Sequence, residues 1–293
     1  MGFEATASSL VVGVLLGGIF SLAALGLSLI LGVLRLVNLA HGEFLVIGAY
    51  AGFYLLATTG IDPLLGLPLI AAAMALAAAP LYRYLVEPLM GRGDEAPMMT
   101  MFGLSIVLQN LCTAAFSADT RSIETAYSAR ALNVGPVTVG LVYVIGFAIS
   151  VCIVGLTHLL VSRTAFGRDL RASAQDPAAA AIVGVNVSRV RMLTFALGAA
   201  CAGAGGTLSG LIYSFTPASG AAFLLNSFAV VVLGGLGSVL GTLLAGIAVG
   251  VLQSLGGVFL GDGYRDLVAL VLFLAALIIR PQGFVAARGM QAR

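Results

Sequence analysis

An uncharged stretch of about 70 residues decides the fold of this chain. It extends from Met192 to Gly261 and reads MLTFALGAACAGAGGTLSGLIYSFTPASGAAFLLNSFAVVVLGGLGSVLGTLLAGIAVGVLQSLGGVFLG. As a continuous helix it would exceed about 100 Å, roughly three times the hydrocarbon core of a bilayer. Turn-forming residues interrupt it at Ser214–Gly220 and again at Gly234–Ser238. The sequence therefore predicts three membrane crossings here, at about Met192–Tyr213, Ala221–Leu233 and Val239–Leu260.

The rest of the chain has the same composition. Of 293 residues, 60% are hydrophobic and only 9% are charged, whereas soluble domains carry about 25% charged residues. We therefore expect an all-α, polytopic integral membrane protein with about 8–9 transmembrane segments, forming one transmembrane domain over residues 1–293. The short N-terminus lacks a basic segment, so no cleavable signal peptide is expected. The remaining predicted crossings are Ser9–Leu34, Phe44–Thr59, Leu64–Tyr82, Pro97–Ser117, Thr138–Val161 and Asp266–Ile279.

The main polar insert lies between the fifth and sixth predicted crossings. It reads RTAFGRDLRASAQDPAAAAIVGVNVSRVR (residues 163–191), and a basic loop between spans is expected to face the cytoplasm. With the insert inside, three arginines fall outside, Arg121, Arg130 and Arg265. Eleven fall inside, namely Arg35, Arg83, Arg92, Arg163, Arg168, Arg171, Arg189, Arg191, Arg280, Arg288 and Arg293. This bias predicts an external N-terminus and a cytoplasmic C-terminus, although a split first span would reverse the N-terminus.

The alanine-rich part of the insert has the signals of a short helix. Asp176 suits the N-cap, Pro177 the first turn and Gly184 the end. Small residues at Ala178–Ala181 would let a partner approach closely, so we interpret this segment as a docking element. Residues 118–136 form an external loop of mixed charge, which would carry a short helix or hairpin for an external partner or serve as a solvated connector.

Several classes of chemistry are excluded or unsupported. All fourteen basic residues are arginine, which excludes a Walker A motif and lysine Schiff-base chemistry. Cys112, Cys152 and Cys201 lie in apolar runs without metal-ligand spacing, and a net charge of +2 gives no indication of nucleic-acid binding. His41 and Glu43 match the start of the zinc-deaminase signature, but the required PCxxC is missing. We expect no catalytic residues and no metal site on this chain.

Two predicted breaks carry polar residues or glycines. The first is RLVNLAHGEF (residues 35–44), either a broken helix beside a substrate path or an ordinary cytoplasmic turn with Arg35 and Glu43 snorkelling or paired. The second is GGLGSVLG (residues 234–241), where glycines permit close packing or a break. The breaks are about 200 residues apart, which suggests two similar halves and a transporter.

Glycine pairs spaced by four residues occur in several predicted helices and at the second break. Such pairs allow helix backbones to approach closely, either within the chain or at a subunit interface. The pairs are Gly13/Gly17, Gly206/Gly210, Gly237/Gly241 and Gly246/Gly250.

Four segments resemble one transporter family. GLSLILGVLRLVNLAHGEFLVIGAY (residues 26–50) is similar to the N-terminal signature of LivH-type permeases, and residues 163–208, 230–253 and 264–285 also match, including the terminal RPQG. These permeases are membrane subunits of ABC importers for branched-chain amino acids and related compounds. The EAA-loop string of other ABC permeases is not literally present, and residues 118–136 match least.

The resemblance implies specific site residues. A coupling helix in the insert would dock on a cytoplasmic ATPase through Arg168, Arg171, Gln175, Asp176, Pro177, Ala180 and Gly184. The translocation path would include Asn38, His41, Gly42 and Glu43 from the first break, and Gly234, Gly235, Gly237 and Ser238 from the second.

The resemblance also implies partners and a location. We expect two ATPase subunits that bind ATP and Mg, a homologous second permease or a second copy of this chain, a periplasmic substrate-binding protein, and the lipid of a bacterial inner membrane. The expected substrate is a branched-chain amino acid, with urea, short amides and aromatic acids as alternatives. A stand-alone secondary transporter or channel would need charged relays within the spans, for which only Glu43 and His158 are available. A membrane enzyme would need a clustered catalytic set, which the sequence lacks.

Overall fold

The computed structural model describes residues 3–93, 95–134 and 137–279. Within these residues, eight helices are long and apolar enough to cross a membrane, which confirms the all-α polytopic prediction. A ninth long helix, α11, has 15 residues. The long helices are α1 (Phe3–Leu34), α2 (His41–Thr59), α3 (Pro63–Leu81), α4 (Glu95–Phe116), α5 (Leu141–Arg163), α8 (Val187–Gly210), α9 (Gly220–Gly234), α10 (Val239–Leu260) and α11 (Arg265–Ile279).

Short elements connect the long helices. The π-helix η1 (Tyr82–Val86) and the 3-10 helix η2 (Glu87–Leu89) extend α3, η3 (Pro217–Ser219) precedes α9, and η4 (Asp262–Tyr264) precedes α11. The polar insert contains α6 (Ala165–Gln175) and α7 (Pro177–Ile182). Strands β1 (Ala131–Val134) and β2 (Val137–Gly140) pair antiparallel, so of the two shapes expected in the external loop the hairpin forms. The sequence predicted that the fifth span begins at Thr138. The helix instead begins at Leu141, because Thr138 belongs to β2.

A seam of glycines joins α1 to α10. A Cβ on Gly13 would lie 2.7 Å from the Cα of Val251, and one on Gly250 would lie 2.6 Å from the Cα of Gly17. The pairs Gly13/Gly17 and Gly246/Gly250 therefore face each other within one chain, so the intrachain alternative is confirmed for them. Ser21 adds hydrogen bonds from its Oγ to two carbonyl oxygens, Gly17 O at 2.6 Å and Leu243 O at 3.0 Å.

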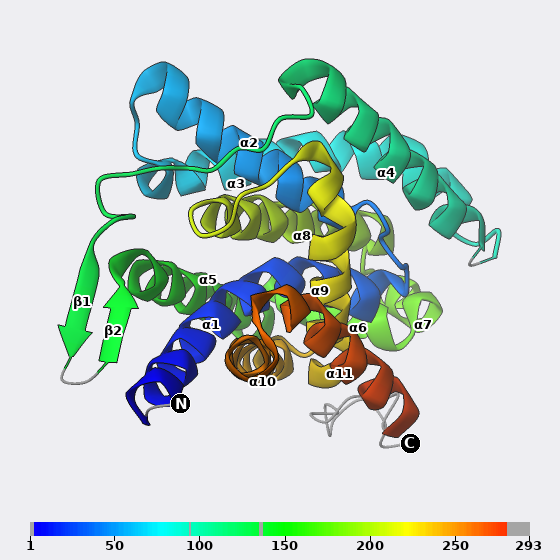
Figure 1. Ribbon diagram of the computed structural model, residues 1–293. Coiled ribbons are helices and arrows are strands. Elements are labelled where there is room, and N and C mark those ends of the chain that lie inside the picture. Colours follow the sequence, from blue (N-terminus) through cyan, green and yellow to red (C-terminus); the bar gives the residue numbers. More distant parts are fainter. Residues whose placement is uncertain (1–2, 94, 135–136, 280–293) are drawn as a thin grey trace.

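The two ends of the bundle can be told apart by their polar contacts. At the insert end, Arg83 pairs with Glu87 at 2.8 Å, and Glu87 accepts a hydrogen bond from Ser188 of the insert. At the opposite end, the Tyr127 hydroxyl donates to Asp62 at 3.0 Å. Figure 1 shows α7 on one side of the molecule and β1 with β2 on the other. Arg83 thus lies on the side of the insert, as the arginine bias predicted.

The prediction for the C-terminus is not tested by this arrangement. Arg280, Arg288 and Arg293 lie outside the described residues, as does the RPQG motif.

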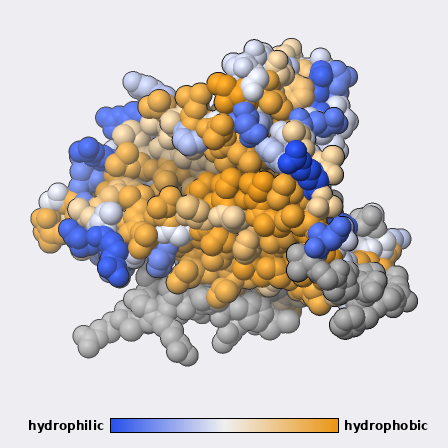
Figure 2. All heavy atoms as spheres, turned by 90° about the vertical axis from the view of Figure 1, so that its left-hand side faces the viewer, coloured by the Kyte–Doolittle hydropathy of each residue, from blue (hydrophilic) through white to orange (hydrophobic). Residues whose placement is uncertain are grey.

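Large apolar side chains cover the outside of the bundle. Leu65 is 79% exposed, Leu76 75% and Leu156 61%, which would be unfavourable in water but suits hydrocarbon. On the face in Figure 2, hydrophobic residues form a continuous central area with hydrophilic residues at its left and right margins. The surface therefore agrees with a protein that is immersed in a bilayer.

Candidate translocation and coupling site

The first break re-enters the bundle. α1 ends at Leu34, and Arg35 turns the chain with a left-handed φ of 53°. Six residues later, His41 Nε2–H donates to the carbonyl oxygen of Ala23 at 2.8 Å. Ala23 lies eleven residues before Leu34, which is about 16 Å along a helix. The chain therefore doubles back, and α2 begins well inside the bundle rather than at its end.

The re-entry buries three polar side chains. Asn38 and His41 are fully buried, and Glu43 is only 4% exposed. Asn38 Oδ1 accepts from the Ala40 amide at 3.1 Å, and Glu43 Oε1 accepts from Ser105 Oγ at 3.4 Å. Asn38 Nδ2, His41 Nδ1 and Glu43 Oε2 have no hydrogen-bond partner among the described residues. Each such group costs about 1–3 kcal/mol, so the burial of three of them in one place calls for an explanation.

The ordinary-turn alternative had Arg35 and Glu43 either snorkelling or paired, and the pairing is wrong for this segment. Arg35 Nη2 instead donates to the carbonyl oxygen of Ala174 in α6 at 3.4 Å, while Glu43 points to Ser105 of α4. The predicted start of the second span at Phe44 was also three residues late. His41, Gly42 and Glu43 form the first turn of α2.

The start of α9 meets the start of α2. A Cβ on Gly220, the first residue of α9, would lie 2.7 Å from Glu43 Oε2, and one on Gly42 would lie 2.7 Å from the carbonyl carbon of Gly220. Helix N-termini carry partial positive charge, so two of them approach the Glu43 carboxylate. We name Asn38, His41, Glu43 and Gly220 the polar junction. The sequence marked Ser214–Gly220 as a turn but gave no signal for this contact, and it gave none for Ser105.

The second break is a tight turn. Gly235 and Gly237 adopt φ angles of 86° and 76°, which favour glycine. Ser238 caps α10, because its Oγ accepts from the Gly241 amide at 3.1 Å. A Cβ on Gly32 would lie 3.0 Å from the Gly237 nitrogen, so this turn packs on the last turn of α1. Gly234 packs against the backbone at Gly241.

The structure does not bring the eight predicted path residues into one place. The polar junction is level with Ala23, whereas the second break is level with Gly32. Nine residues of α1 separate these levels, or about 14 Å. Asn38, His41, Gly42 and Glu43 lie at the junction, while Gly234, Gly235, Gly237 and Ser238 form a packed turn nearer to the insert.

The helix predicted in the insert is present with its caps. Asp176 Oδ1 accepts from the amides of Ala178 and Ala179 at 2.9 and 3.0 Å, Pro177 is the first residue of α7, and Gly184 follows the helix with a φ of 90°. Ala180 is buried against the protein, whereas Ile182 is 86% exposed. Arg168, Arg171, Gln175 and Asp176 are exposed, so α7 presents an open apolar surface beside polar groups.

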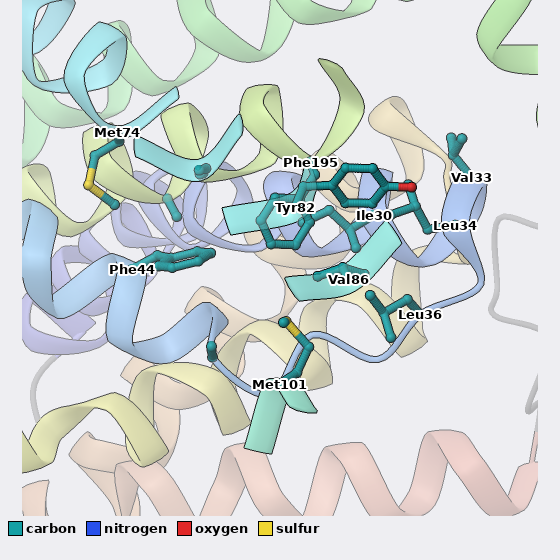
Figure 3. Packing of buried hydrophobic residues seen from close by; sticks show 14 of the residues in the cluster. Ile30, Val33, Leu34, Leu36, Phe44, Met74, Tyr82, Val86, Met101 and Phe195 are labelled. Carbon is teal, nitrogen blue, oxygen red and sulfur yellow. The ribbon is translucent and has the colours of Figure 1, made fainter. Parts of the chain in front are cut away.

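One hydrophobic core connects the insert to the polar junction. Leu170 and Ala174 of α6 belong to the same buried cluster as Leu36 of the first break and Phe44 of α2. In Figure 3, Phe44, Tyr82, Val86, Phe195 and Leu36 gather around one centre. The Phe44 and Phe195 rings lie edge to face, with centroids 6.0 Å apart. The core and the bond from Arg35 to Ala174 therefore link α6 to the segment that leads into α2.

Comparison with known proteins identifies the family. The profile of the family described as "Branched-chain amino acid transport system / permease component" matches residues 9–277. The chain belongs to this permease family. Similar relatives include the high-affinity branched-chain amino acid transport system permease protein BraD of Pseudomonas aeruginosa, 32% identical over 94% of each chain. LivH of Escherichia coli is 29% identical over 93% of each chain, and a probable LivH of Methanocaldococcus jannaschii is 30% identical over 89% of this chain and 87% of the relative.

Family membership fixes the kind of protein. The chain is a permease subunit of the ABC transporter class, spans the membrane several times and is not itself an enzyme. The resemblance noted in residues 26–50 and in three later segments therefore led to the right family. The comparisons give no individual contacts at the junction or at α7.

Proposed function

We propose that this chain is the permease of an ABC importer in a bacterial inner membrane. It would pass branched-chain amino acids, or a related small polar solute, from a periplasmic binding protein to the cytoplasm. The proposal is supported by relatives named as branched-chain amino acid permeases, which align over nearly their whole length. Urea, short amides and aromatic acids are the alternative substrates for the same class of importer.

The observation that carries the proposal is the polar junction inside an apolar bundle. Ionisable residues at membrane depth almost always face the bundle interior or a water-filled cavity, and they mark substrate paths. Here, two helices begin inside the bundle and direct their positive ends toward Glu43, as in transporters with broken helices. Asn38, His41, Gly42 and Glu43 would therefore line or gate the path. Gly234, Gly235, Gly237 and Ser238 would hold the turn that supports it.

The geometry also suggests how ATP would drive the path. α7 would dock on an ATPase subunit through Arg168, Arg171, Gln175, Asp176, Pro177, Ala180 and Gly184. Movement of α7 would carry α6, and α6 contacts the first break through the bond from Arg35 to Ala174 and through the shared core. The start of α2 would then shift relative to α9, which would open or close the junction.

The proposed importer contains further chains. It would comprise two ATPase subunits that bind ATP and Mg, a homologous second permease or a second copy of this chain, and a periplasmic binding protein. Neither the hydrolysis of ATP nor any other covalent step would occur on this chain.

The test is ATPase activity of the assembled complex in lipid nanodiscs, with and without a leucine-loaded binding protein. Stimulation by the loaded protein would support an importer for branched-chain amino acids. Assembly with no response to leucine, but a response when the binding protein carries urea, an amide or an aromatic acid, would replace the substrate and keep the class. Failure to bind any ATPase subunit, together with solute uptake in its absence, would overturn the proposal in favour of a secondary transporter.

A further inference from the structure

A separate cavity opens at the end of the bundle opposite to the insert. It has a volume of roughly 200 Å³ and lies between α1, α2, the end of α8, α9, α10 and the start of α11. The segment after α8 contributes Tyr213 and Ser214 to its rim, and this segment is paired with the external loop through two backbone bonds between Arg121 and Phe215, at 2.8 and 2.9 Å. The cavity therefore faces the side from which an importer receives its solute.

One wall of this cavity is polar although the surrounding helices are apolar. Gln253 Nε2 donates to Asn226 Oδ1 at 2.8 Å. Ser227 is 2% exposed, and its Oγ has no hydrogen-bond partner among the described residues. Gln253 is 4% exposed. Hydroxyl and amide groups in such a place are available to a bound molecule that can both donate and accept hydrogen bonds.

The remaining lining defines charge and shape. Among the described residues that line the cavity, Arg265 is the only charged one, and none is acidic. Phe20, Leu45 and Phe223 supply apolar surface. A cavity with mostly apolar walls and a few converging polar groups is the usual form of a small-molecule site. Here the single positive charge selects for an anionic group, because a guanidinium matches a carboxylate in charge and geometry.

The cavity leads toward the polar junction. Its lining includes Ala23, whose carbonyl oxygen accepts the bond from His41, and Leu45, two residues after Glu43. A molecule in the cavity would therefore lie next to the junction on its external side. Binding there would precede any passage through the junction.

We propose that this cavity is an entry site for amphipathic solutes that carry a carboxylate. Arg265 binds the carboxylate, the wall formed by Asn226, Ser227 and Gln253 binds a second polar group, and the aromatic and leucine side chains receive the apolar part. A guanidinium has five N–H donors, so Arg265 can bind a solute while it keeps contacts within the chain. The inference rests on the proposed importer function and narrows its substrate to carboxylates, at the expense of urea and neutral amides.

The test uses cysteine labelling in membranes that contain the whole transporter. Ala222 lines the cavity, and Ala222→Cys in a Cys152→Ser background places a thiol there, since Cys152 is the exposed native cysteine. An anionic and a cationic thiosulfonate reagent of equal size are compared. The anionic reagent is expected to react preferentially, and Arg265→Gln should lower the anionic-to-cationic rate ratio roughly tenfold. Arg130→Gln, an exposed arginine of the external loop, is the matched control and should leave the ratio unchanged.

Protection by solutes tests recognition of the carboxylate. Saturating leucine or benzoate is expected to slow labelling of Ala222→Cys at least threefold, whereas leucinamide and urea should not, and Arg265→Gln should abolish the protection. Equal protection by leucine and leucinamide, or no protection by leucine and benzoate, would overturn the proposal. So would an anionic-to-cationic rate ratio that Arg265→Gln leaves unchanged. Labelling requires no ATP, so failure of the ATPase test and failure of this test are distinguishable.

Discussion

The two breaks of this chain have related sequence signals but different structures. The first, residues 35–40, folds back along α1 and buries Asn38, His41 and Glu43 near the middle of the bundle. The second, residues 235–238, turns at the end of α1 and is closed by its own backbone and by the Ser238 cap. In this chain, the break that re-enters the bundle is the one that places polar side chains at depth. A break that stays at the end remains a packing element.

The length and composition of the two segments account for this difference. Six residues separate α1 from α2, and they include Asn38, whose side chain bonds to the Ala40 amide and stabilises a turn at depth. Only four residues separate α9 from α10, and glycines there allow contact with Gly32 but offer no side chain for a ligand. The first break is thus expected to affect transport, and the second to affect folding.

The largest effect is expected from a side chain that overfills the tight contact between the second break and α1. Gly32→Val places a Cβ against the Gly237 backbone, and overpacking in a dense core costs about 1–3 kcal/mol or more. We expect a marked loss of folded protein, measured as the monodisperse fraction in size-exclusion chromatography. Gly103→Val is the matched control, since nothing lies within 4 Å of a Cβ at that helical position. A well-folded Gly32→Val protein that fails only in transport would contradict the assignment of this turn to packing.

The next effect concerns transmission from α7 to the first break. Asp176→Arg removes two capping bonds and places a positive charge at a helix start, with a combined cost of about 2 kcal/mol. We expect transport per ATP hydrolysed to fall roughly tenfold while membrane insertion stays normal. Asp176→Asn keeps an acceptor for the cap and should retain most of the coupling. Normal uptake by Asp176→Arg would refute the role of α7.

A smaller effect is expected at the polar junction itself. Glu43→Gln keeps the shape but removes the negative charge between two helix N-termini, an interaction of up to about 1 kcal/mol. Uptake is therefore expected to slow roughly fivefold, while thermal unfolding changes little. Glu124→Gln, on an exposed residue of the external loop, should change neither property. If Glu43→Gln transports normally, the junction does not line the path, and the two breaks differ in depth only.

Much of this fold is predictable from the sequence, because apolar length and arginine placement act locally. The runs around Met192–Gly261 give the spans, and Asp176 with Pro177 gives the cap of α7. The re-entry after Arg35 is harder to predict, since hydropathy cannot distinguish a helix that begins at the membrane surface from one that begins about 16 Å deeper.

The contacts of the candidate site could not be predicted from the sequence. Gly220 and Ser105 reach Glu43 only through tertiary packing, and the cavity beside Arg265 is lined by residues of six long helices from both ends of the chain. Nothing in GGLGS indicates whether this segment lies beside a substrate path or against the backbone at Gly32. The sequence therefore predicted both breaks to line the path.

The smallest effect separates the two breaks most directly. Ser238→Ala removes the cap of α10, which costs about 1 kcal/mol, and so lowers the melting temperature by a few degrees in a detergent-based thermal unfolding assay. The turn that holds Ser238 packs at the level of Gly32, about 14 Å along the α1 axis from the level of the polar junction. Uptake per folded molecule should therefore be unchanged. Ser238→Asp should restore the stability, because the carboxylate again caps the helix. Asn38→Ala removes a comparable local bond at the other break, yet it should reduce uptake as well as stability. If both alanine variants reduce uptake equally, the second break belongs to the path, and the distinction between a re-entrant site and a packed turn fails.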